Sequence, residues 1–205
     1  MGGTFIAFEG GEGAGKSTQE AMLAQWLTDR GHDVVRTREP GGTPAGEVIR
    51  TVLLGNEYEG LDERAEALLF AAARGEHVAR VIRPALEAGN VVVCDRFIDS
   101  SIAYQGVGRS LGIDVVRELN TWATHGLLPD LTVVLDVDPV IGLSRVGSPD
   151  RLESEPIEYH QAVRQAFLDI ANVEPDRYLV VDSAQEPEAI SALIREQVTA
   201  RLADE

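Results

Sequence analysis

The sequence predicts a doubly wound α/β fold, in which helices cover both faces of a five-stranded parallel sheet. Short apolar runs recur along the chain, and each is followed by a stretch with helical character. This alternation favours parallel strands, because each helix carries the chain back across a face of the sheet. Hydrophobic residues make up 44% of the 205 residues, which is enough for a real core. We therefore expect one domain, residues 1–205, with at most a small mobile insert.

Five runs are predicted as strands because they are short, β-branched and almost continuously apolar. Strands of this composition are buried on both faces of a parallel sheet. In chain order they are Thr4–Glu9, Val34–Arg38, Val91–Asp95, Leu131–Asp136 and Tyr178–Asp182. Ligands of such sheets gather at the carboxyl ends of the strands, so charged residues at those ends are the first candidates for a site.

Six helices are predicted between and after these strands, and the third has Asp62 as a candidate N-cap. Trp26 and Trp122 are expected on apolar helix faces that pack into the core. The predicted helices are Lys16–Arg30, Glu47–Leu54, Glu63–Ala88, Asp114–His125, Ile157–Ala171 and Pro187–Leu202.

The net charge and the composition of the chain limit the kinds of partner that it is expected to bind. The formal net charge of −16 repels nucleic acid and anionic membranes at long range, so neither is expected as a partner. No apolar run is long enough to span a membrane, and the first residues lack the features of a signal peptide. Cys94 is the single cysteine, which excludes an internal disulfide and a cysteine metal cage. Together these features predict a cytoplasmic location.

A glycine-rich loop follows the first predicted strand and opens the first predicted helix. Residues 10–17 read GGEGAGKS and fit the pattern G-x-x-x-x-G-K-[ST] at every fixed position. Small residues let backbone N–H groups wrap around phosphate oxygens at the start of a helix. We therefore expect a P-loop NTPase fold, with Lys16 on the β- and γ-phosphates and Ser17 on Mg²⁺. The predicted triphosphate-binding residues of the loop are Gly10, Gly11, Glu12, Gly13, Ala14, Gly15, Lys16, Ser17 and Thr18.

Other residues separate the classes of P-loop protein. Lys16 is the only lysine, so the Asn-Lys-x-Asp guanine reader of GTPases is absent. The strand Leu131–Asp136 is followed by only a weak match to the adjacent acidic residues of shape-changing ATPases. What remains is an enzyme that moves the terminal phosphate of a nucleoside triphosphate onto a small acceptor.

A second set of residues is spaced for an anionic acceptor with a flat ring. The pairs Arg38-Glu39 and Asp95-Arg96 close the second and third predicted strands. Phe70 and Arg74 are four residues apart on a predicted helix and share a face. An aromatic ring beside a guanidinium group suits a carbonyl-bearing base, because the ring stacks on the base and the arginine donates to it.

At these positions the chain resembles the thymidylate kinases, and the matching segments occur in order over nearly the whole chain up to about Ala171. The P-loop is shared by many enzymes, but the Arg-Glu-Pro-Gly-Gly and Ala-Tyr-Gln-Gly segments are far more specific. The matching segments are residues 8–17, 37–43, 69–74, 95–97, 100–106 and 129–132.

The resemblance implies that ATP is the phosphate donor, that dTMP is the acceptor and that the chain forms a homodimer. It implies that Phe70 stacks on thymine, that Arg74 bonds a base carbonyl and that Gln105 reads the remaining base edge. Tyr104 would pack under the sugar, and Glu12 would meet the sugar or a metal-bound water.

The resemblance also assigns the groups around the phosphates. Ser100 and Ser101 would support the acceptor site. Asp95 would hold Mg²⁺ through water together with Ser17, and Glu39 in the acceptor site is the second carboxylate that would do so. The guanidinium groups that would hold the acceptor phosphate are those of Arg38, Arg50 and Arg96, and the groups expected to act in catalysis are Lys16, Arg96, Arg151 and Glu12.

A short mobile lid is expected over residues 146–154, where Gly, Ser and Pro are frequent. The P-loop has Gly13 where some family members carry an arginine, so the lid would supply the charge for the transition state. The resemblance makes Arg151 that arginine and places Arg145 on the adenine, although the two could exchange roles. A surface ion pair of Arg151 with Asp150 or Glu153 is the alternative.

The chemistry expected of such a site needs no general base. A phosphate monoester has a second pKa of about 6, so the acceptor is already a dianion near pH 7. Catalysis then consists of alignment and of the cancellation of negative charge. The alternatives are another small-molecule or nucleoside-monophosphate kinase on the same fold, and a nucleotide-gated binding protein with slow hydrolysis.

Overall fold

The structure is a computed structural model that describes residues 2–203. Five strands form one parallel sheet, as the sequence predicts, and their order in the sheet is β2-β3-β1-β4-β5. The strands begin and end within one residue of the predicted runs. They are β1 Phe5–Glu9, β2 Val34–Arg38, β3 Val91–Asp95, β4 Leu131–Asp136 and β5 Tyr178–Asp182.

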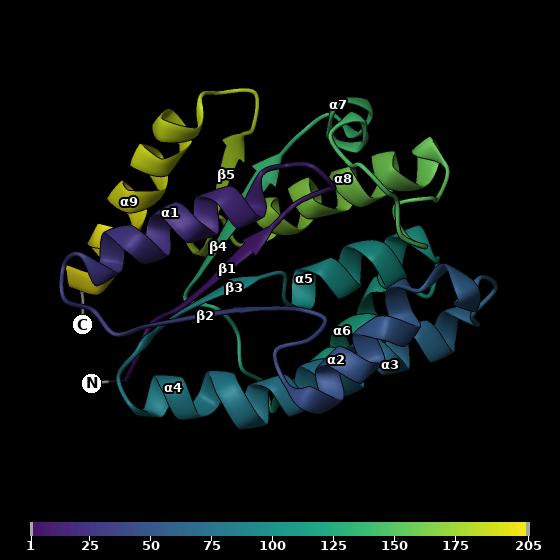
Figure 1. Ribbon diagram of the computed structural model, residues 1–205, viewed down its shortest axis with the longest axis horizontal. Coiled ribbons are helices and arrows are strands. Elements are labelled where there is room, and N and C mark those ends of the chain that lie inside the picture. The colour runs from purple at the N-terminus through teal and green to yellow at the C-terminus, as the bar shows by residue number, and fades with distance from the viewer. Residues whose placement is uncertain (1, 204–205) are drawn as a thin grey trace.

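The helices cover both faces of the sheet (Figure 1). Helices α1 (Lys16–Thr28) and α9 (Pro187–Ala203) lie on one face, and α4 (Arg83–Glu87), α5 (Ile98–Ser101) and α8 (Ile157–Val173) cover the other. The remaining helical segments are α2 Pro44–Leu54, α3 Glu63–His77, α6 Ile113–Thr124, α7 Pro139–Ser144, η1 Asn56–Tyr58, η2 Val78–Ile82, η3 Ile102–Gly108 and η4 Pro175–Arg177.

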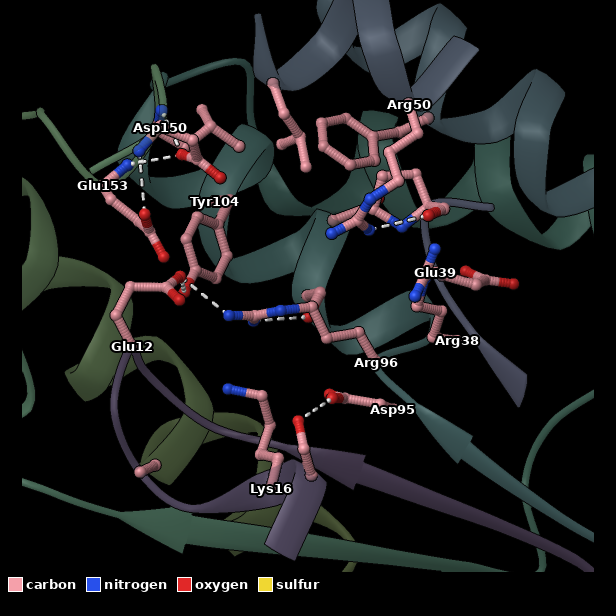
Figure 2. Close-up of a pocket in the computed structure, with 18 of the residues that line it drawn as sticks. Glu12, Lys16, Arg38, Glu39, Arg50, Asp95, Arg96, Tyr104, Asp150 and Glu153 are labelled. Atoms are coloured by element: carbon pink, nitrogen blue, oxygen red, sulfur yellow. Dashed lines mark hydrogen bonds and ion pairs between the residues drawn. The ribbon is translucent and has the colours of Figure 1, made fainter. Parts of the chain in front are cut away.

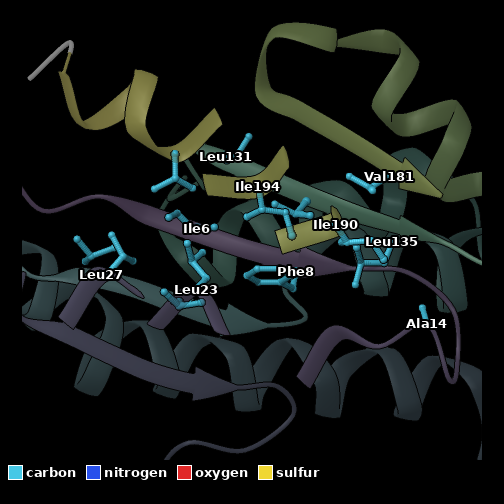
Figure 3. Close-up of a cluster of buried hydrophobic side chains, with 14 of the residues drawn as sticks. Ile6, Phe8, Ala14, Leu23, Leu27, Leu131, Leu135, Val181, Ile190 and Ile194 are labelled. Atoms are coloured by element: carbon cyan, nitrogen blue, oxygen red, sulfur yellow. The ribbon is translucent and has the colours of Figure 1, made fainter. Parts of the chain in front are cut away.

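Alternate residues of the central strand supply the cores of the two faces. Ile6 and Phe8 point to α1 and α9 (Figure 3), whereas Phe5 and Ala7 pack on the opposite face with Ile82 of η2. All four strand residues are at most 1% exposed, as expected of a strand covered on both sides. This rigid core fixes the carboxyl ends of the strands relative to one another.

The strand register brings the charged ends together. Phe8 of β1 pairs with Asp95 of β3, and Arg38 of β2 pairs with the same aspartate. The segments that leave β1, β2 and β3 therefore begin side by side at one edge of the sheet. This is the edge at which doubly wound sheets bind ligands.

The prediction of one continuous helix over residues 63–88 is wrong in one respect, because the π-helical segment η2 separates α3 from α4. Pro84 follows this segment and has no N–H to donate to the carbonyl four residues earlier. A wider π-helical turn accommodates such an interruption without ending the helix. The N-cap prediction is confirmed, since the Asp62 carboxylate accepts hydrogen bonds from Arg64 N and Ala65 N.

Some helical segments lie where none is predicted, and α5, η3 and α7 are the longest of them. Residues 98–108 form α5 and η3, which carry much of the expected acceptor site, and residues 139–144 form α7. The start of α7 is marked in the sequence by Asp138, which accepts from Val140 N, followed by Pro139 at the first helical position. Within residues 2–203, no helix has the length and apolar character needed to span a membrane.

Candidate active site

The glycine-rich loop connects β1 to α1 and forms the floor of the site. Gly15 caps α1 with a φ of 91°, a left-handed conformation that suits glycine, and the helix begins at Lys16. The Lys16 ammonium donates to the carbonyl oxygens of Gly10 and Gly11 at 3.0 and 2.8 Å. Burial and the nearby Arg96 lower the pKa of Lys16. A phosphate in the loop would replace these carbonyl contacts with charged ones.

Helix α7 packs directly against the loop at Gly13. This residue has a φ of 63°, and a Cβ there would lie 2.1 Å from the carbonyl oxygen of Gly142. Arg145, at the end of α7, donates from Nη1 to the Gly13 carbonyl oxygen at 2.8 Å. Arg145 is exposed and does not line the main pocket, so the structure places it on the outside of the phosphate loop.

One cavity of about 420 Å³ joins the loop to the second set of predicted residues (Figure 2). On the loop side it is lined by residues 12–18, so the predicted loop residues reach it except Gly10 and Gly11. On the opposite side it is lined by nine residues predicted for the acceptor, namely Arg38, Glu39, Arg50, Phe70, Arg96, Ser100, Ser101, Tyr104 and Gln105.

Three guanidinium groups from different elements line the acceptor side. Arg38 lies at the end of β2 and pairs with Glu47 at 3.1 Å, and both side chains are about half exposed. Arg50 of α2 donates to the Pro40 carbonyl oxygen at 2.8 Å. Burial and the neighbouring charge of Arg38 lower the pKa of Arg50, and these effects outweigh the opposing charges of Glu47 and Asp150. A phosphate dianion is the ligand that this arrangement would stabilise.

Arg96 links the two sides of the cavity. Its φ of 69° is unusual for a residue with a side chain and marks local strain, which proteins concentrate at functional sites. Its Nη2 pairs with Glu12 Oε1 at 2.7 Å, and its Nη1 donates to Gly10 O and Ser100 Oγ, both at 3.2 Å. The Tyr104 hydroxyl donates to the same Glu12 oxygen at 2.6 Å. Figure 2 shows the Arg96 side chain above Lys16, with its guanidinium group directed towards Glu12.

The electrostatics of Glu12 favour its ionised form near neutral pH. Burial alone would raise the pKa of its carboxyl group, but Arg96 and Lys16 outweigh burial and lower that pKa to about 2. A carboxylate with so low a pKa retains no useful affinity for a proton at pH 7. Glu12 therefore acts on the position and charge of Arg96 and Tyr104.

A candidate magnesium site lies between the loop and β3. The Ser17 hydroxyl donates to Asp95 Oδ2 at 3.0 Å. The other carboxylate oxygen of Asp95 is buried and has no hydrogen-bond partner in the described part of the chain. Among those same residues no group of three or more His, Cys, Asp or Glu could hold a metal. One serine and one carboxylate fit Mg²⁺, which is commonly bound by few protein ligands together with substrate phosphates.

The expected base pocket is only partly as predicted. Phe70 and Gln105 line the cavity, but Arg74 does not. The Arg74 side chain is 1% exposed and donates to Glu39 Oε2 at 2.6 Å, to Ser101 and Asn120, and to the Phe97 carbonyl oxygen. Direct contact of Arg74 with a base carbonyl is therefore not seen, because buried partners occupy its guanidinium group.

Glu39 is also occupied by buried partners. Besides Arg74, its other carboxylate oxygen lies 2.9 Å from His77 Nδ1, and His77 Nε2 lies 2.6 Å from Thr37 Oγ1. The residue is only 5% exposed although it reaches the cavity wall. This network makes Glu39 a support for the turn after β2, and it leaves neither oxygen unpartnered.

The predicted lid is docked in this structure. Arg151 is buried, pairs through Nη1 with Glu66 Oε2 at 2.7 Å, and donates from Nε to the Leu53 carbonyl oxygen at 3.0 Å. Leu152 packs in a cluster with Leu53 and Phe70. Arg151 does not line the cavity, so the expectation that it faces the transferred phosphate is not met here.

Some residues at the site are not anticipated from the sequence. Glu66 and Asn120 are buried partners of predicted site residues, and Asp150 and Glu153 line the cavity. Asp150 and Glu153 cap each other, since each side chain accepts from the other's backbone N–H. Their three-residue spacing resembles a capping box, and Glu66 precedes Phe70 by one helical turn, so both signals are present in the sequence.

Comparisons with known proteins agree with this geometry. The family model described as thymidylate kinase matches residues 8–194. A thymidylate kinase of Clavibacter michiganensis subsp. michiganensis is 53% identical and covers 99% of this chain and 98% of its own. One from Cutibacterium acnes is 50% identical, covering 98% and 99%. The crystal structure of thymidylate kinase from Ehrlichia chaffeensis superposes with a TM-score of 0.82 at 35% identity, covering 97% and 100%. The chain therefore belongs to the thymidylate kinase family.

Proposed function

We propose that the chain transfers the γ-phosphate of ATP to dTMP, giving ADP and dTDP, with the two nucleotides end to end in one cavity. Membership of the thymidylate kinase family supports this reaction. The observation that carries the proposal is the single cavity, which connects a phosphate loop to a second site with three arginines and an aromatic ring. A protein that only binds or senses a triphosphate has no need of that second site.

Positioning and charge carry the reaction in this proposal. The ATP phosphates accept hydrogen bonds from the loop amides and from Lys16. To bind them, the Lys16 ammonium gives up its hydrogen bonds to the carbonyl oxygens of Gly10 and Gly11. The dTMP phosphate lies among the guanidinium groups of Arg38 and Arg50, and Arg96 reaches both nucleotides. The attacking oxygen belongs to a phosphate that is already ionised, so no residue has to remove a proton.

Mg²⁺ would be held by Ser17 and, through water, by Asp95. The ion would supply positive charge to the oxygens of the β- and γ-phosphates. The unpartnered oxygen of Asp95 and its bond to Ser17 support this assignment. A carboxylate that accepts from only one protein donor has capacity left for a metal-bound water.

The acceptor base would stack on Phe70, with Gln105 at its edge and Tyr104 beneath the sugar. Arg74 supports this pocket from behind, since it holds Ser101, Glu39 and the Phe97 carbonyl in place. We propose this positioning role for Arg74 because its buried partners leave little of the guanidinium group available to a ligand.

Residues 146–154 would act as a lid that moves against the rest of one kinase domain. In the docked state Arg151 anchors the lid to α3, and Arg145 on α7 is the arginine that contacts the phosphate loop. We therefore assign Arg145 to the ATP side and Arg151 to lid docking. This reverses the expectation for Arg151 and keeps Arg145 near the donor.

A homodimer in the cytoplasm completes the proposal. Helices α3 and α6 pack together and expose large apolar side chains, with Leu68 57%, Val115 63% and Trp122 80% exposed. The expectation that Trp122 packs into the core is therefore wrong. An exposed apolar face of this kind is typical of an association surface. Cys94 is buried and unpaired, as is common in the reducing cytoplasm.

Release of ADP in the presence of dTMP, dUMP, dCMP, dGMP and AMP tests the reaction. We expect dTMP to be preferred to dCMP, dGMP and AMP by roughly a hundredfold or more in kcat/KM. Lys16→Ala should lose nearly all turnover while it keeps the fold, because the substitution removes only the ammonium group that contacts the phosphates. Preference for another monophosphate would indicate a different kinase, and tight ATP binding without acceptor-dependent turnover would indicate a nucleotide-gated binding protein.

A further inference from the structure

Glu66 is a buried carboxylate at the back of the acceptor site, and the proposal above gives it no part in recognition of the base. It lies on α3, is 0% exposed and receives hydrogen bonds from two other segments of the chain. Gln105 of η3 donates from Nε2 to Oε1 at 3.0 Å. Arg109 donates to both oxygens at 3.3 Å, and Arg151 pairs with Oε2 at 2.7 Å.

We propose that Glu66 fixes the orientation of the Gln105 amide and thereby makes the acceptor site selective for a pyrimidine that carries a hydrogen on N3. The inference rests on the proposed function, because it concerns how the same site distinguishes thymine from a cytosine-type base. Glu66 is a positioning residue in this account, since its side chain acts on the base only through Gln105.

The orientation follows from the chemistry of the partners. A carboxylate bonded to two guanidinium groups only accepts hydrogen bonds. Gln105 must therefore turn its NH₂ group towards Glu66, which directs its carbonyl oxygen elsewhere. Gln105 lines the cavity, and no donor among residues 2–203 occupies that oxygen. The oxygen is thus available to a ligand as an acceptor.

The position of Glu66 on the helix matches this role. Phe70 lies four residues later on α3, so the stacking ring and the carboxylate share one face. A base stacked on Phe70 would present its edge to Gln105 from η3. Thymine and uracil have an N–H at position 3, which the fixed oxygen accepts. Cytosine has a lone pair there, which would face the lone pairs of the oxygen.

Without the carboxylate, the amide could not discriminate in this way. An amide side chain offers a donor and an acceptor of nearly the same shape, and a half-turn exchanges them. A neutral partner at position 66 could accept from or donate to Gln105, so either orientation would be satisfied. The negative charge of Glu66 is what excludes one of the two.

The test compares Glu66→Gln with Glu155→Gln as a matched control. Glu155 pairs with Arg109 at 2.6 Å, so the control removes the same charge from the same network without touching Gln105. The acceptors are dTMP, dUMP and 5-methyl-dCMP. The first two share the N3–H and differ by the methyl group, whereas dTMP and 5-methyl-dCMP share the methyl group and differ in the ring edge.

We expect Glu66→Gln to lower the dTMP to 5-methyl-dCMP ratio of kcat/KM about tenfold, the effect of one hydrogen bond. The dTMP to dUMP ratio should not change, and Glu155→Gln should keep both ratios. If Glu66→Gln does not fold, the charge-balanced double variant Glu66→Gln/Arg109→Gln carries the same expectation.

An equal loss for all three acceptors would make Glu66 merely structural and overturn the inference. No turnover of dTMP by the unmodified chain would instead refute the proposed function.

Discussion

Glu12 and Arg96 show how single residues at this site are tuned for charge and position. The pair lies between the phosphate loop and the acceptor side, and each side chain is less than one-fifth exposed. Arg96 is the dominant charge that lowers the pKa of Glu12, and the strained backbone of Arg96 aims its guanidinium group across the cavity. The carboxylate therefore orients an arginine in this account.

The role of Glu12 can be tested by the pH dependence of turnover. In the unmodified chain, kcat/KM for dTMP should rise as pH increases through about 6, where the acceptor phosphate loses its second proton. Glu12 has a pKa of about 2, so it stays ionised above pH 5 and adds no limb to the profile. Glu12→Gln should lower kcat/KM at least about tenfold, because Arg96 loses its partner, and should leave the limb near pH 6. Loss of that limb in the variant, with substrate binding intact, would make Glu12 a base.

Residue identities were predicted better than residue contacts. Phe70, Gln105 and the arginines predicted for the acceptor phosphate reach the cavity, as their sequence context suggests. Arg74 was predicted on the same helix face as Phe70, but its long side chain ends on Glu39 and Ser101. Helical spacing gives the direction of a side chain from its helix, whereas its final partners come from segments that spacing does not describe.

Among the structural elements, the lid differs most from what was predicted from the sequence. Residues 150–153 form a capped turn that docks on α2 and α3 through Arg151 and Leu152. Arg145 lies outside this turn, at the C-terminal cap of α7, and contacts the phosphate loop. Arg151 thus makes the contact that docks the turn, whereas Arg145 contacts the phosphate loop.

Substitution of each arginine by methionine separates these roles. Arg151→Met should reduce the free energy of unfolding by about 2 kcal/mol, since a buried partner of Glu66 is lost while Arg109 remains. Its kcat should fall by less than about fivefold. Arg145→Met should leave stability nearly unchanged and weaken ATP binding. Denaturant unfolding and steady-state kinetics measure both variants. A hundredfold fall in kcat for Arg151→Met without destabilisation would restore the transition-state role.

The elements themselves were predictable where the sequence is strongly patterned. The strands were located within one residue because their runs are apolar and bounded by polar turns. The segment 98–108 was missed because α5 is only four residues long and η3 is π-helical, so the pattern lacks the usual 3.6-residue period. Yet this segment positions Ser100, Tyr104 and Gln105, so the site depends on an element that periodicity does not reveal.

In the molecule as a whole, a few positively charged side chains gather at the cavity although the chain is strongly acidic. The net charge is −16, but the cavity gathers Lys16, Arg38 and Arg96 where β1, β2 and β3 end, together with Arg50 of α2. The sequence predicts this convergence, because parallel strands bring their carboxyl ends to one edge. It does not predict the network around Glu66, whose members at positions 105, 109 and 151 come from distant parts of the chain. Such contacts are determined by packing.

The proposed reaction requires that two nucleotides occupy the one cavity with their phosphates facing each other. A crystal structure of the chain with dTMP and a non-hydrolysable ATP analogue tests it most directly. We expect thymine on Phe70 with its N3 edge at Gln105, and the triphosphate on the loop around Lys16. The dTMP phosphate should lie among Arg38, Arg50 and Arg96. Thymine bound away from Phe70 and Gln105, or a dTMP phosphate outside the arginine cluster, would contradict it.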